Sequence, residues 1–78
     1  MSAKVRLRIR QKIIAGTLPG EPPTTTWASM GSGLPCGACE EPIRPSETEM
    51  ELELRNNRPT VRLHRECYEM WKDECDHR

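Results

Sequence analysis

The sequence predicts a small α+β domain, and three observations lead to that class. Two couples of metal-binding residue types, each with the spacing i, i+3, flank residues 40–63. They are Cys36 with Cys39 and His64 with Cys67. Between the couples apolar residues alternate with charged ones, which is the period of a β-hairpin. Towards both ends of the chain apolar residues recur with the period of a helix. The expected order is therefore helix, loop, hairpin and helix.

Size and composition indicate that this domain needs a cross-link. The chain has 78 residues, of which 35% are hydrophobic, with no Phe, one Tyr and two Trp. Domains of this size bury little apolar surface, and a disulfide or a metal ion commonly stabilises them. We therefore expect cysteines to stabilise the fold, either by binding a metal together with a histidine or, if all four pair, by forming disulfides in one of three pairings.

The sequence shows no targeting or membrane segment. Arginines interrupt the apolar residues of residues 1–20, so this stretch lacks the continuous core of a signal peptide. No stretch reaches the length needed to span a membrane. We expect a cytoplasmic protein, and because the cytoplasm is reducing, metal binding is favoured over disulfides.

Residues 1–18 predict a basic amphipathic helix. Apolar residues recur at i, i+4 and i+8 from Val5 to Ile13, although alternate residues of this stretch also fit a strand. The ends favour the helix, because Ser2 is a candidate N-cap and Gly16 a helix stop. Five basic residues of this segment form what we call the basic arm: Lys4, Arg6, Arg8, Arg10 and Lys12.

The net charge of zero conceals an uneven distribution. Residues 1–20 contain the five basic residues of the arm and no acid, whereas residues 40–54 contain six glutamates and one arginine. The two segments therefore carry +5 and −5. Opposite charges of this size either attract each other or bind different partners, and the sequence leaves both possibilities open.

Residues 19–35 predict a linker or an irregular loop. Four prolines, a run of three threonines and a Gly-Ser-Gly sequence are typical of such segments. The segment contains one aromatic residue, Trp27. Its side chain either anchors the loop on the domain or is exposed as a contact for a partner.

Residues 36–78 are expected to form one domain that begins with a loop and a hairpin. Pro42 and Pro45 exclude a long helix directly after Cys39. A period of two follows on both sides of a predicted turn at residues 56–59. Its apolar positions are Met50, Leu52 and Leu54 before the turn and Val61 and Leu63 after it. This pattern predicts a β-hairpin with one buried face, while the intervening glutamates face water.

A helix that begins near His64 is expected to end the domain. At about 100° per residue, one face holds both the ligand candidates and the aromatic residues. These residues are His64, Cys67, Tyr68, Trp71 and Cys75. The residues expected to face water are Arg65, Glu66, Glu69, Lys72 and Asp73. The metal ligands and the core residues therefore share one face.

The two couples predict one closed zinc site, with one structural Zn²⁺ per chain. A C-x-x-C turn brings two sulfurs to one ion, and residues i and i+3 of a helix do the same. The predicted ligands are Cys36, Cys39, His64 and Cys67. Cys75 lies about 12 Å further along the helix than Cys67 and is expected to pack against the domain or to fray. Cys75 and His77 are the alternative ligands.

The pattern C-x-x-C…H-x-x-C over residues 36–67 resembles the first zinc-binding half of a LIM domain. The resemblance implies a treble-clef layout, in which a loop, a hairpin and a helix surround one zinc ion held by the four predicted ligands. This chain departs from LIM domains because no second C-x-x-C couple follows, and because the 24-residue spacer is slightly longer. The resemblance therefore extends to the single site and the layout, and not to LIM partners.

Three enzymatic alternatives fit the sequence poorly. A zinc deaminase needs H-x-E before P-C-x-x-C and an open coordination position, whereas here Cys67 closes the shell. Thiol–disulfide exchange needs a cysteine at a helix N-terminus after a buried strand, but Gly, Ser and Pro precede Cys36. Metal-assisted hydrolysis needs an open site and a general base. We expect a non-enzymatic protein without a small-molecule substrate.

Binding to another macromolecule is the expected function. The first hypothesis is a protein-interaction or regulatory module, because the glutamate-rich strand would repel the phosphates of a nucleic acid. The second is a nucleic-acid-binding regulator whose basic arm neutralises phosphates. The basic arm and Trp27 are the candidate contacts for a partner, and no membrane partner is expected.

Overall fold

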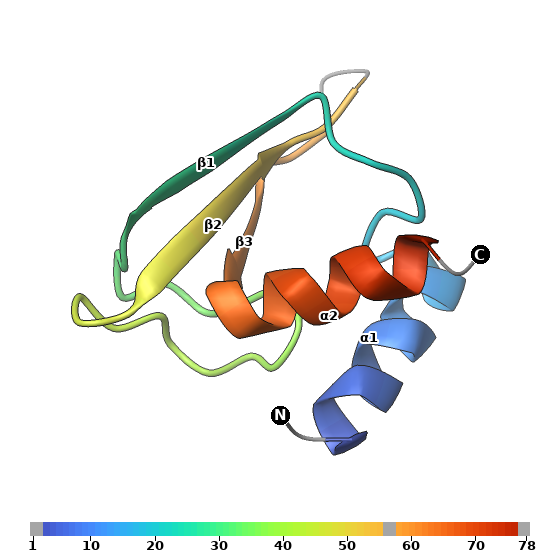
Figure 1. Ribbon diagram of the computed structural model, residues 1–78, viewed down its shortest axis with the longest axis horizontal. Helices are drawn as coiled ribbons and strands as arrows, with labels where there is room; N and C mark the ends of the chain where they lie inside the picture. Colours follow the sequence, from blue (N-terminus) through green and yellow to red (C-terminus); the bar gives the residue numbers. More distant parts are fainter. Residues whose placement is uncertain (1–2, 56–57, 77–78) are drawn as a thin grey trace.

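The computed structural model describes residues 3–55 and 58–76 of the chain. These residues form two helices and a three-stranded antiparallel sheet (Figure 1), in agreement with the predicted α+β class. In chain order the elements are α1 (Ala3–Ala15), β1 (Thr25–Met30), β2 (Thr48–Glu53), β3 (Val61–His64) and α2 (Arg65–Asp76). Within the described ranges no helix combines the length and the apolar character needed to cross a membrane.

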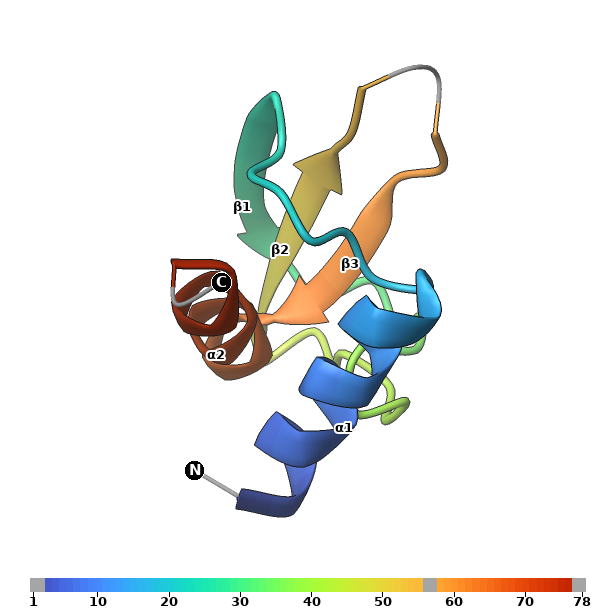
Figure 2. The same ribbon diagram turned by 90° about the vertical axis from the view of Figure 1, so that its right-hand side faces the viewer.

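The sheet has β2 at its centre and β1 and β3 at its two edges. Its register places Trp27 of β1 opposite Glu51, and Met50 opposite Leu63 of β3. α2 packs against β2 and β3, and α1 lies against α2 (Figure 2). β1 packs against β2 and against no other helix or strand of the described part, and none of its residues is fully buried.

The core lies between the two helices and the inner face of β2 and β3. Its completely buried side chains are Ile9, Leu18, Cys36, Ile43, Leu52, Leu63 and Trp71. The indole N–H of Trp71 donates a 2.8 Å hydrogen bond to the carbonyl of Pro19, so the polar edge of the largest core residue has a partner. Each fully buried aliphatic or aromatic side chain contributes about 1.5–3 kcal/mol, so the two ends of the chain are held together mainly by this cluster.

The predicted N-terminal helix is confirmed as α1. Its inward face is buried, with Ile9 inaccessible to solvent. Gly16 ends the helix with a positive φ of 83°, and the N–H of Thr17 donates a 2.9 Å hydrogen bond to the carbonyl of Lys12. A glycine is suited to this conformation because it has no Cβ. The candidate N-cap Ser2 lies outside the described residues.

The prediction of irregular structure over residues 19–35 is wrong for residues 25–30, which form β1. Their sequence, Thr-Thr-Trp-Ala-Ser-Met, contains no proline and several residues that favour strands. It does not alternate between apolar and polar residues, because neither face of β1 is fully buried. Trp27 is 54% exposed on this strand, so it does not anchor a loop in the core.

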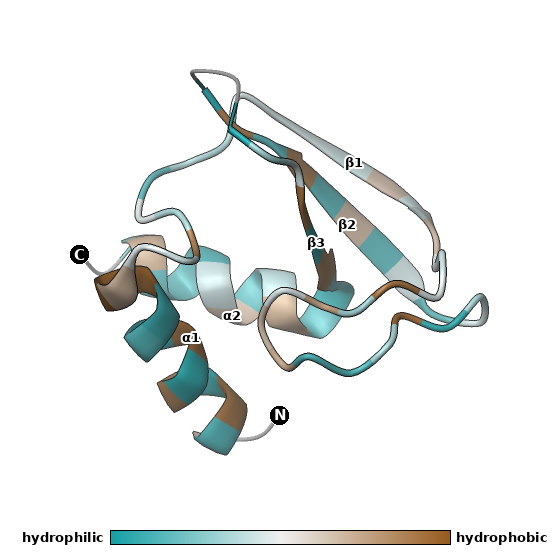
Figure 3. Ribbon diagram, turned by 180° about the vertical axis from the view of Figure 1, so that it is seen from behind, coloured by the Kyte–Doolittle hydropathy of each residue, from teal (hydrophilic) through white to brown (hydrophobic). Residues whose placement is uncertain are grey.

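The predicted hairpin is confirmed as β2 and β3, which pair antiparallel. Leu52 and Leu63 are completely buried on its inner face, and Figure 3 shows hydrophobic and hydrophilic residues alternating along β2. The outer face departs from the expectation, because Glu49 is only 3% exposed. Its carboxylate accepts hydrogen bonds from the N–H and the hydroxyl of Ser32 and lies 3.4 Å from Nε of Arg62. Hydrogen bonds and a cation thus compensate the burial of this charge.

The predicted terminal helix is confirmed from Arg65 onwards, but His64 is the last residue of β3. A strand therefore presents the imidazole, and a helix presents the last cysteine of the couple. Met70 and Glu74 are also buried, although neither belongs to the predicted inward face. Residues 56–57 of the predicted turn lie outside the described residues.

Candidate metal centre

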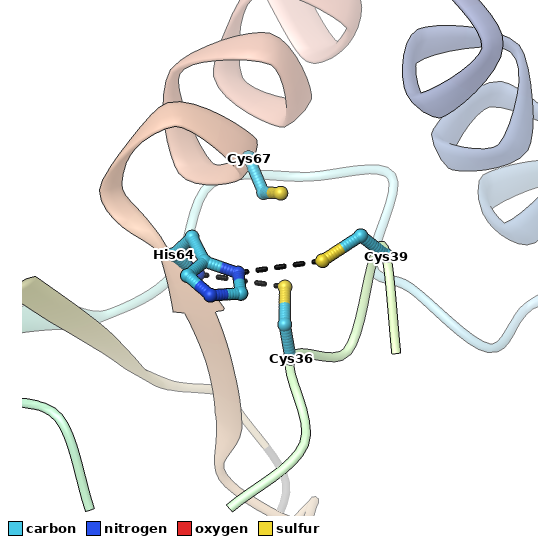
Figure 4. A group of neighbouring side chains, drawn as sticks. All are labelled: Cys36, Cys39, His64 and Cys67. Carbon is cyan, nitrogen blue, oxygen red and sulfur yellow. Dashed lines mark hydrogen bonds between the residues drawn. The ribbon is translucent and has the colours of Figure 1, made fainter. Parts of the chain in front are cut away.

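The first couple lies in a tight turn, residues 36–40, which we call the knuckle. The N–H of Glu40 donates a 2.9 Å hydrogen bond to the carbonyl of Cys36 and closes the turn. Glu40 has a positive φ of 68°, which allows the chain to reverse directly behind Cys39. As a result, both sulfur atoms point towards the same space (Figure 4).

The second couple is presented by the junction of β3 and α2. His64 ends the strand, and Cys67 lies in the first turn of the helix. The N–H of Gly37 donates a 2.7 Å hydrogen bond to the carbonyl of Arg62, and the N–H of His64 donates to Sγ of Cys36 at 3.4 Å. These two bonds attach the knuckle to the outer edge of β3.

The four predicted ligands converge on one point (Figure 4). They are Cys36, Cys39, His64 and Cys67. Their ligand atoms all lie within 4.8 Å of one another. A tetrahedral zinc ion separates sulfur and nitrogen ligands by about 3.6–3.8 Å, so shifts of about 1 Å or less would give that geometry. The group is close enough to bind one metal ion.

A carboxylate fixes the orientation of His64. Nδ1 of the ring lies 3.3 Å from Sγ of Cys39, while Nε2 lies 3.4 Å from Oε1 of Glu47. That carboxylate also accepts a 2.9 Å hydrogen bond from the N–H of Arg44. Metal-binding histidines commonly donate their second ring N–H to a carboxylate, which sets the tautomer and leaves the other nitrogen for the ion. The sequence carried no sign of this role, because Glu47 is one of six glutamates in residues 40–54.

Hydrogen bonds couple the thiols of the cluster. The hydrogen bond from Cys67 lowers the pKa of Cys36 to about 4, and backbone N–H groups of the knuckle and of His64 assist it. The same hydrogen bond raises the pKa of Cys67, and burial raises the pKa of Cys39. Burial opposes protonation of His64, but the Cys36 thiolate raises its pKa overall. The cluster therefore holds one thiolate and two thiols near neutral pH, and a metal ion must displace the protons of those thiols.

The basic arm contacts the knuckle. Nη1 of Arg8 donates a 3.2 Å hydrogen bond to the carbonyl of Cys39, and Nζ of Lys12 donates a 2.9 Å bond to the carbonyl of Gly37. Nζ of Lys12 also lies 3.2 Å from the carboxylate of Glu40. α1 thus adds positive charge beside a site that carries thiolates.

Two arginines of the arm pair with acids of α2. Nη1 of Arg6 lies 2.8 Å from Oδ2 of Asp73 and 3.3 Å from Oε1 of Glu74. Nη2 of Arg10 lies 3.0 Å from the same Oε1, and the hydrogen bonds of Arg10 lower the pKa of Glu74. Lys4 is exposed at the start of the helix. The opposite charges of the chain therefore attract each other, but the arm binds the knuckle and α2 rather than the hairpin.

The remaining candidates lie outside the cluster. Trp27 belongs to β1, and Cys75 packs against the core from α2, with its Sγ 3.8 Å from the carbonyl of Pro19. This confirms the expectation that Cys75 packs against the domain. His77, the other alternative ligand, lies outside the described residues.

A surface cleft of about 540 Å³ opens beside the cluster. Cys39, His64 and Cys67 line it together with Glu47 and Met70. The chain matches no protein-family model, no curated protein and no solved structure. The donors and the geometry of the site itself therefore indicate its chemistry.

Proposed function

We propose that this chain is a non-enzymatic structural-zinc module that acts as a small protein-interaction domain. The observation that supports this most is the state of the basic arm, of which four residues contact carboxylates or carbonyl groups of the same chain. Phosphates of a nucleic acid would have to compete with these contacts. Exposed large apolar side chains, such as Trp27 and Met30, favour a protein partner instead.

Zinc is the ion that suits the donors best. Three thiolates with one imidazole are a common set for structural zinc, and the four protein donors fill a tetrahedral shell. A filled shell leaves no position for a reactive water, which supports a structural rather than a catalytic role. The succession of knuckle, hairpin and helix supports a treble-clef finger similar to the first half of a LIM domain, to which this chain adds α1 and β1.

A reducing compartment such as the cytoplasm fits the proposal. The described cysteines form no disulfide, and the ligand thiols must remain reduced to bind a metal. In an oxidising compartment the two couples would be exposed to competing disulfide formation.

Binding of oligonucleotides at low and at physiological salt tests the choice of partner. We expect the zinc-loaded protein to bind random duplex and single-stranded oligonucleotides weakly or not at all. The alternative, a nucleic-acid-binding regulator, predicts an affinity that falls steeply with salt and that decreases further in Lys4→Gln, a variant of an exposed residue that the fold does not use. Such a result would contradict the proposal.

Capture of a protein partner is the positive test. The full chain, immobilised with zinc bound, should retain a protein in stoichiometric amount, and the retention should decrease when Trp27 is replaced by Ser. Replacement of Ile14 by Ser is the matched control, because that residue is also apolar and is 73% exposed, but lies on α1. Equal retention by both variants would mean that β1 is not the contact.

A further inference from the structure

β1 is an edge strand without the usual protection against pairing. Natural edge strands commonly carry charged residues or prolines that prevent another strand from binding. The six residues of β1 include neither. Met30 is 75% exposed and Trp27 is 54% exposed. Among the described helices and strands, β1 contacts only β2.

The contacts of β3 show which peptide groups of the sheet face outwards. Successive peptide groups of a strand point in opposite directions. In β3, the carbonyl of Arg62 and the N–H of His64 face the knuckle, so the even-numbered residues point away from β2. The odd-numbered residues of β3 therefore point towards β2, and the register pairs them with even-numbered residues of that strand.

The same alternation can be followed across β2 to β1. The odd-numbered residues of β2 point towards β1, where the register pairs them with odd-numbered residues. The 2.9 Å hydrogen bond from the N–H of Gly31 to the carbonyl of Glu47 continues this pattern beyond Met30, whereas before Thr25 the N–H of Thr24 also donates to the carbonyl of Glu53. Thr26, Ala28 and Met30 therefore direct their N–H and C=O groups away from the sheet. These three residues form what we call the open edge.

We propose that a second copy of this chain covers the open edge, with the two β1 strands antiparallel and their Trp27 residues opposite each other. The inference rests on the proposed function, because it names one partner and one surface of the interaction domain. Centred on Trp27, the pair places Thr26 opposite Ala28 of the second copy in both directions, so outward-facing peptide groups meet outward-facing peptide groups. The result is a continuous six-stranded sheet.

The position of Trp27 favours this register over a neighbouring one. Trp27 is odd-numbered, so in the pair it occupies a non-hydrogen-bonded position, where opposite side chains approach most closely. Two indole rings on one face of an antiparallel pair are a favourable cross-strand contact. A pair centred on Ala28 would satisfy the same peptide groups but would place each indole opposite Ser29.

Charge favours a second copy over an acidic peptide. β1 has no charged residue, so self-pairing opposes no like charges. On the same face as Trp27, the neighbouring Glu51 lies 3.6 Å from Nη2 of Arg62, so this row of the sheet is already paired within the chain. In the proposed dimer a two-fold axis passes between the two Trp27 residues. The row of Trp27, Glu51 and Arg62, in which the two charges compensate each other, therefore occurs on both sides of the axis. An acidic strand would meet the carboxylates of Glu51 and Glu53 on this face.

The test is sedimentation equilibrium of the purified, zinc-loaded full chain from micromolar to near-millimolar concentrations. We expect the mass to rise with concentration from 9.0 kDa towards twice that value. Trp27→Lys should keep the protein monomeric, because it places two like charges opposite each other. Ile14→Lys makes the same change at an exposed apolar residue of α1 and should leave the dimer intact. Zinc content checks the fold of each variant.

Three outcomes would overturn the proposal: a wild-type protein that stays monomeric, a dimer that survives Trp27→Lys, or a dimer lost equally in Ile14→Lys. If Trp27→Lys fails to bind zinc, Trp27→Ser replaces it and should weaken dimerisation at least tenfold. Mixing Trp27→Lys with Trp27→Glu should restore a dimer, because only positions that face each other gain from opposite charges. A monomeric wild type would reject self-pairing alone, since the oligonucleotide and capture experiments test the proposed function separately.

Discussion

The two edges of the sheet differ in how their outward peptide groups are satisfied. At the β3 edge the knuckle supplies both partners, since Gly37 donates to Arg62 and the sulfur of Cys36 accepts from His64. At the β1 edge no described helix or strand has this function. The comparison teaches that the proposed metal site does more than join two couples of ligands. It also holds in place the segment that closes one edge of the sheet.

Removal of the metal is the largest change that the comparison predicts. Structural zinc contributes about 10–16 kcal/mol of apparent binding free energy in small zinc domains, more than a chain of this size gains from packing. A chelator, or Cys67→Ser, should therefore unfold β3, the knuckle and α2 together. The edge of β2 that β3 had covered would then become a second edge with unpaired peptide groups. Far-UV circular dichroism and light scattering measure the two effects. Cys75→Ser is the matched control and should retain both metal and fold. An unchanged spectrum after chelation would contradict the role given to the site.

Acidification should release the metal and open the β3 edge more gradually. In the metal-free protein the pKa values of Cys39 and Cys67 are raised, so both thiols are protonated near neutral pH and lose their protons on binding. Protons therefore compete with the ion, and affinity falls as the pH falls. With two thiol protons released, affinity should drop about hundredfold per pH unit near neutral pH, and the drop should steepen below the raised pKa of His64, because the imidazole then also loses a proton on binding. Competition with a chromophoric chelator over a pH series measures the slope. A slope of tenfold or less per unit would mean that one of these thiols binds already ionised.

A change at Glu47 should weaken the metal site without removing a ligand. Glu47→Gln keeps the size of the side chain but replaces the carboxylate that orients His64, and partners of this kind are worth about 10–100-fold in metal affinity. Chelator competition at neutral pH measures the loss, and the β3 edge should remain closed while the ion is bound. Glu41→Gln changes a residue that lines the same cleft, and it should bind the metal as the wild type does. Equal affinities of the two variants would show that Glu47 does not orient the ligand.

A change at Glu74 should have the smallest effect and leave both edges as they are. Glu74→Gln removes a buried carboxylate that accepts hydrogen bonds from Arg10 and Arg6, and should destabilise the fold by about 1–2 kcal/mol in urea. Because Arg10 lowers the pKa of Glu74 below its ordinary 4.5, the stabilisation is complete above that pH and is lost as the pH falls through the lower, folded-state value. The difference in the free energy of unfolding between Glu74→Gln and the wild type should therefore be constant at higher pH and become smaller below pH 4.5. Asp76→Asn, in the exposed last turn of α2, serves as control. A difference that grows on acidification would contradict the assigned ion pairs.

Sequence patterns predicted the parts of this protein that depend on local spacing. The two couples, the alternation from Met50 to Leu54 and the inward face of α1 can each be identified within a few residues. β1 escaped prediction because its partner is another strand and no core covers it, so its sequence shows no alternation. Glu47 and Glu74 escaped for a different reason. Their roles depend on residues brought close by the tertiary fold, and no rule of spacing distinguishes them from the other acids.

The contact between Arg6 and Asp73 joins residues 67 positions apart, and it lies at the two ends of the described chain. During ribosomal synthesis α1 emerges long before the helix that it binds. The metal site likewise lacks its last thiol until Cys67 has left the exit tunnel. Until then the nascent chain has paired thiols, an unneutralised basic helix and a hairpin without its covering helix. The contacts of α1 with α2 and the complete set of four ligands can therefore form only late in synthesis, and we expect the proposed metal ion to bind the chain after that point.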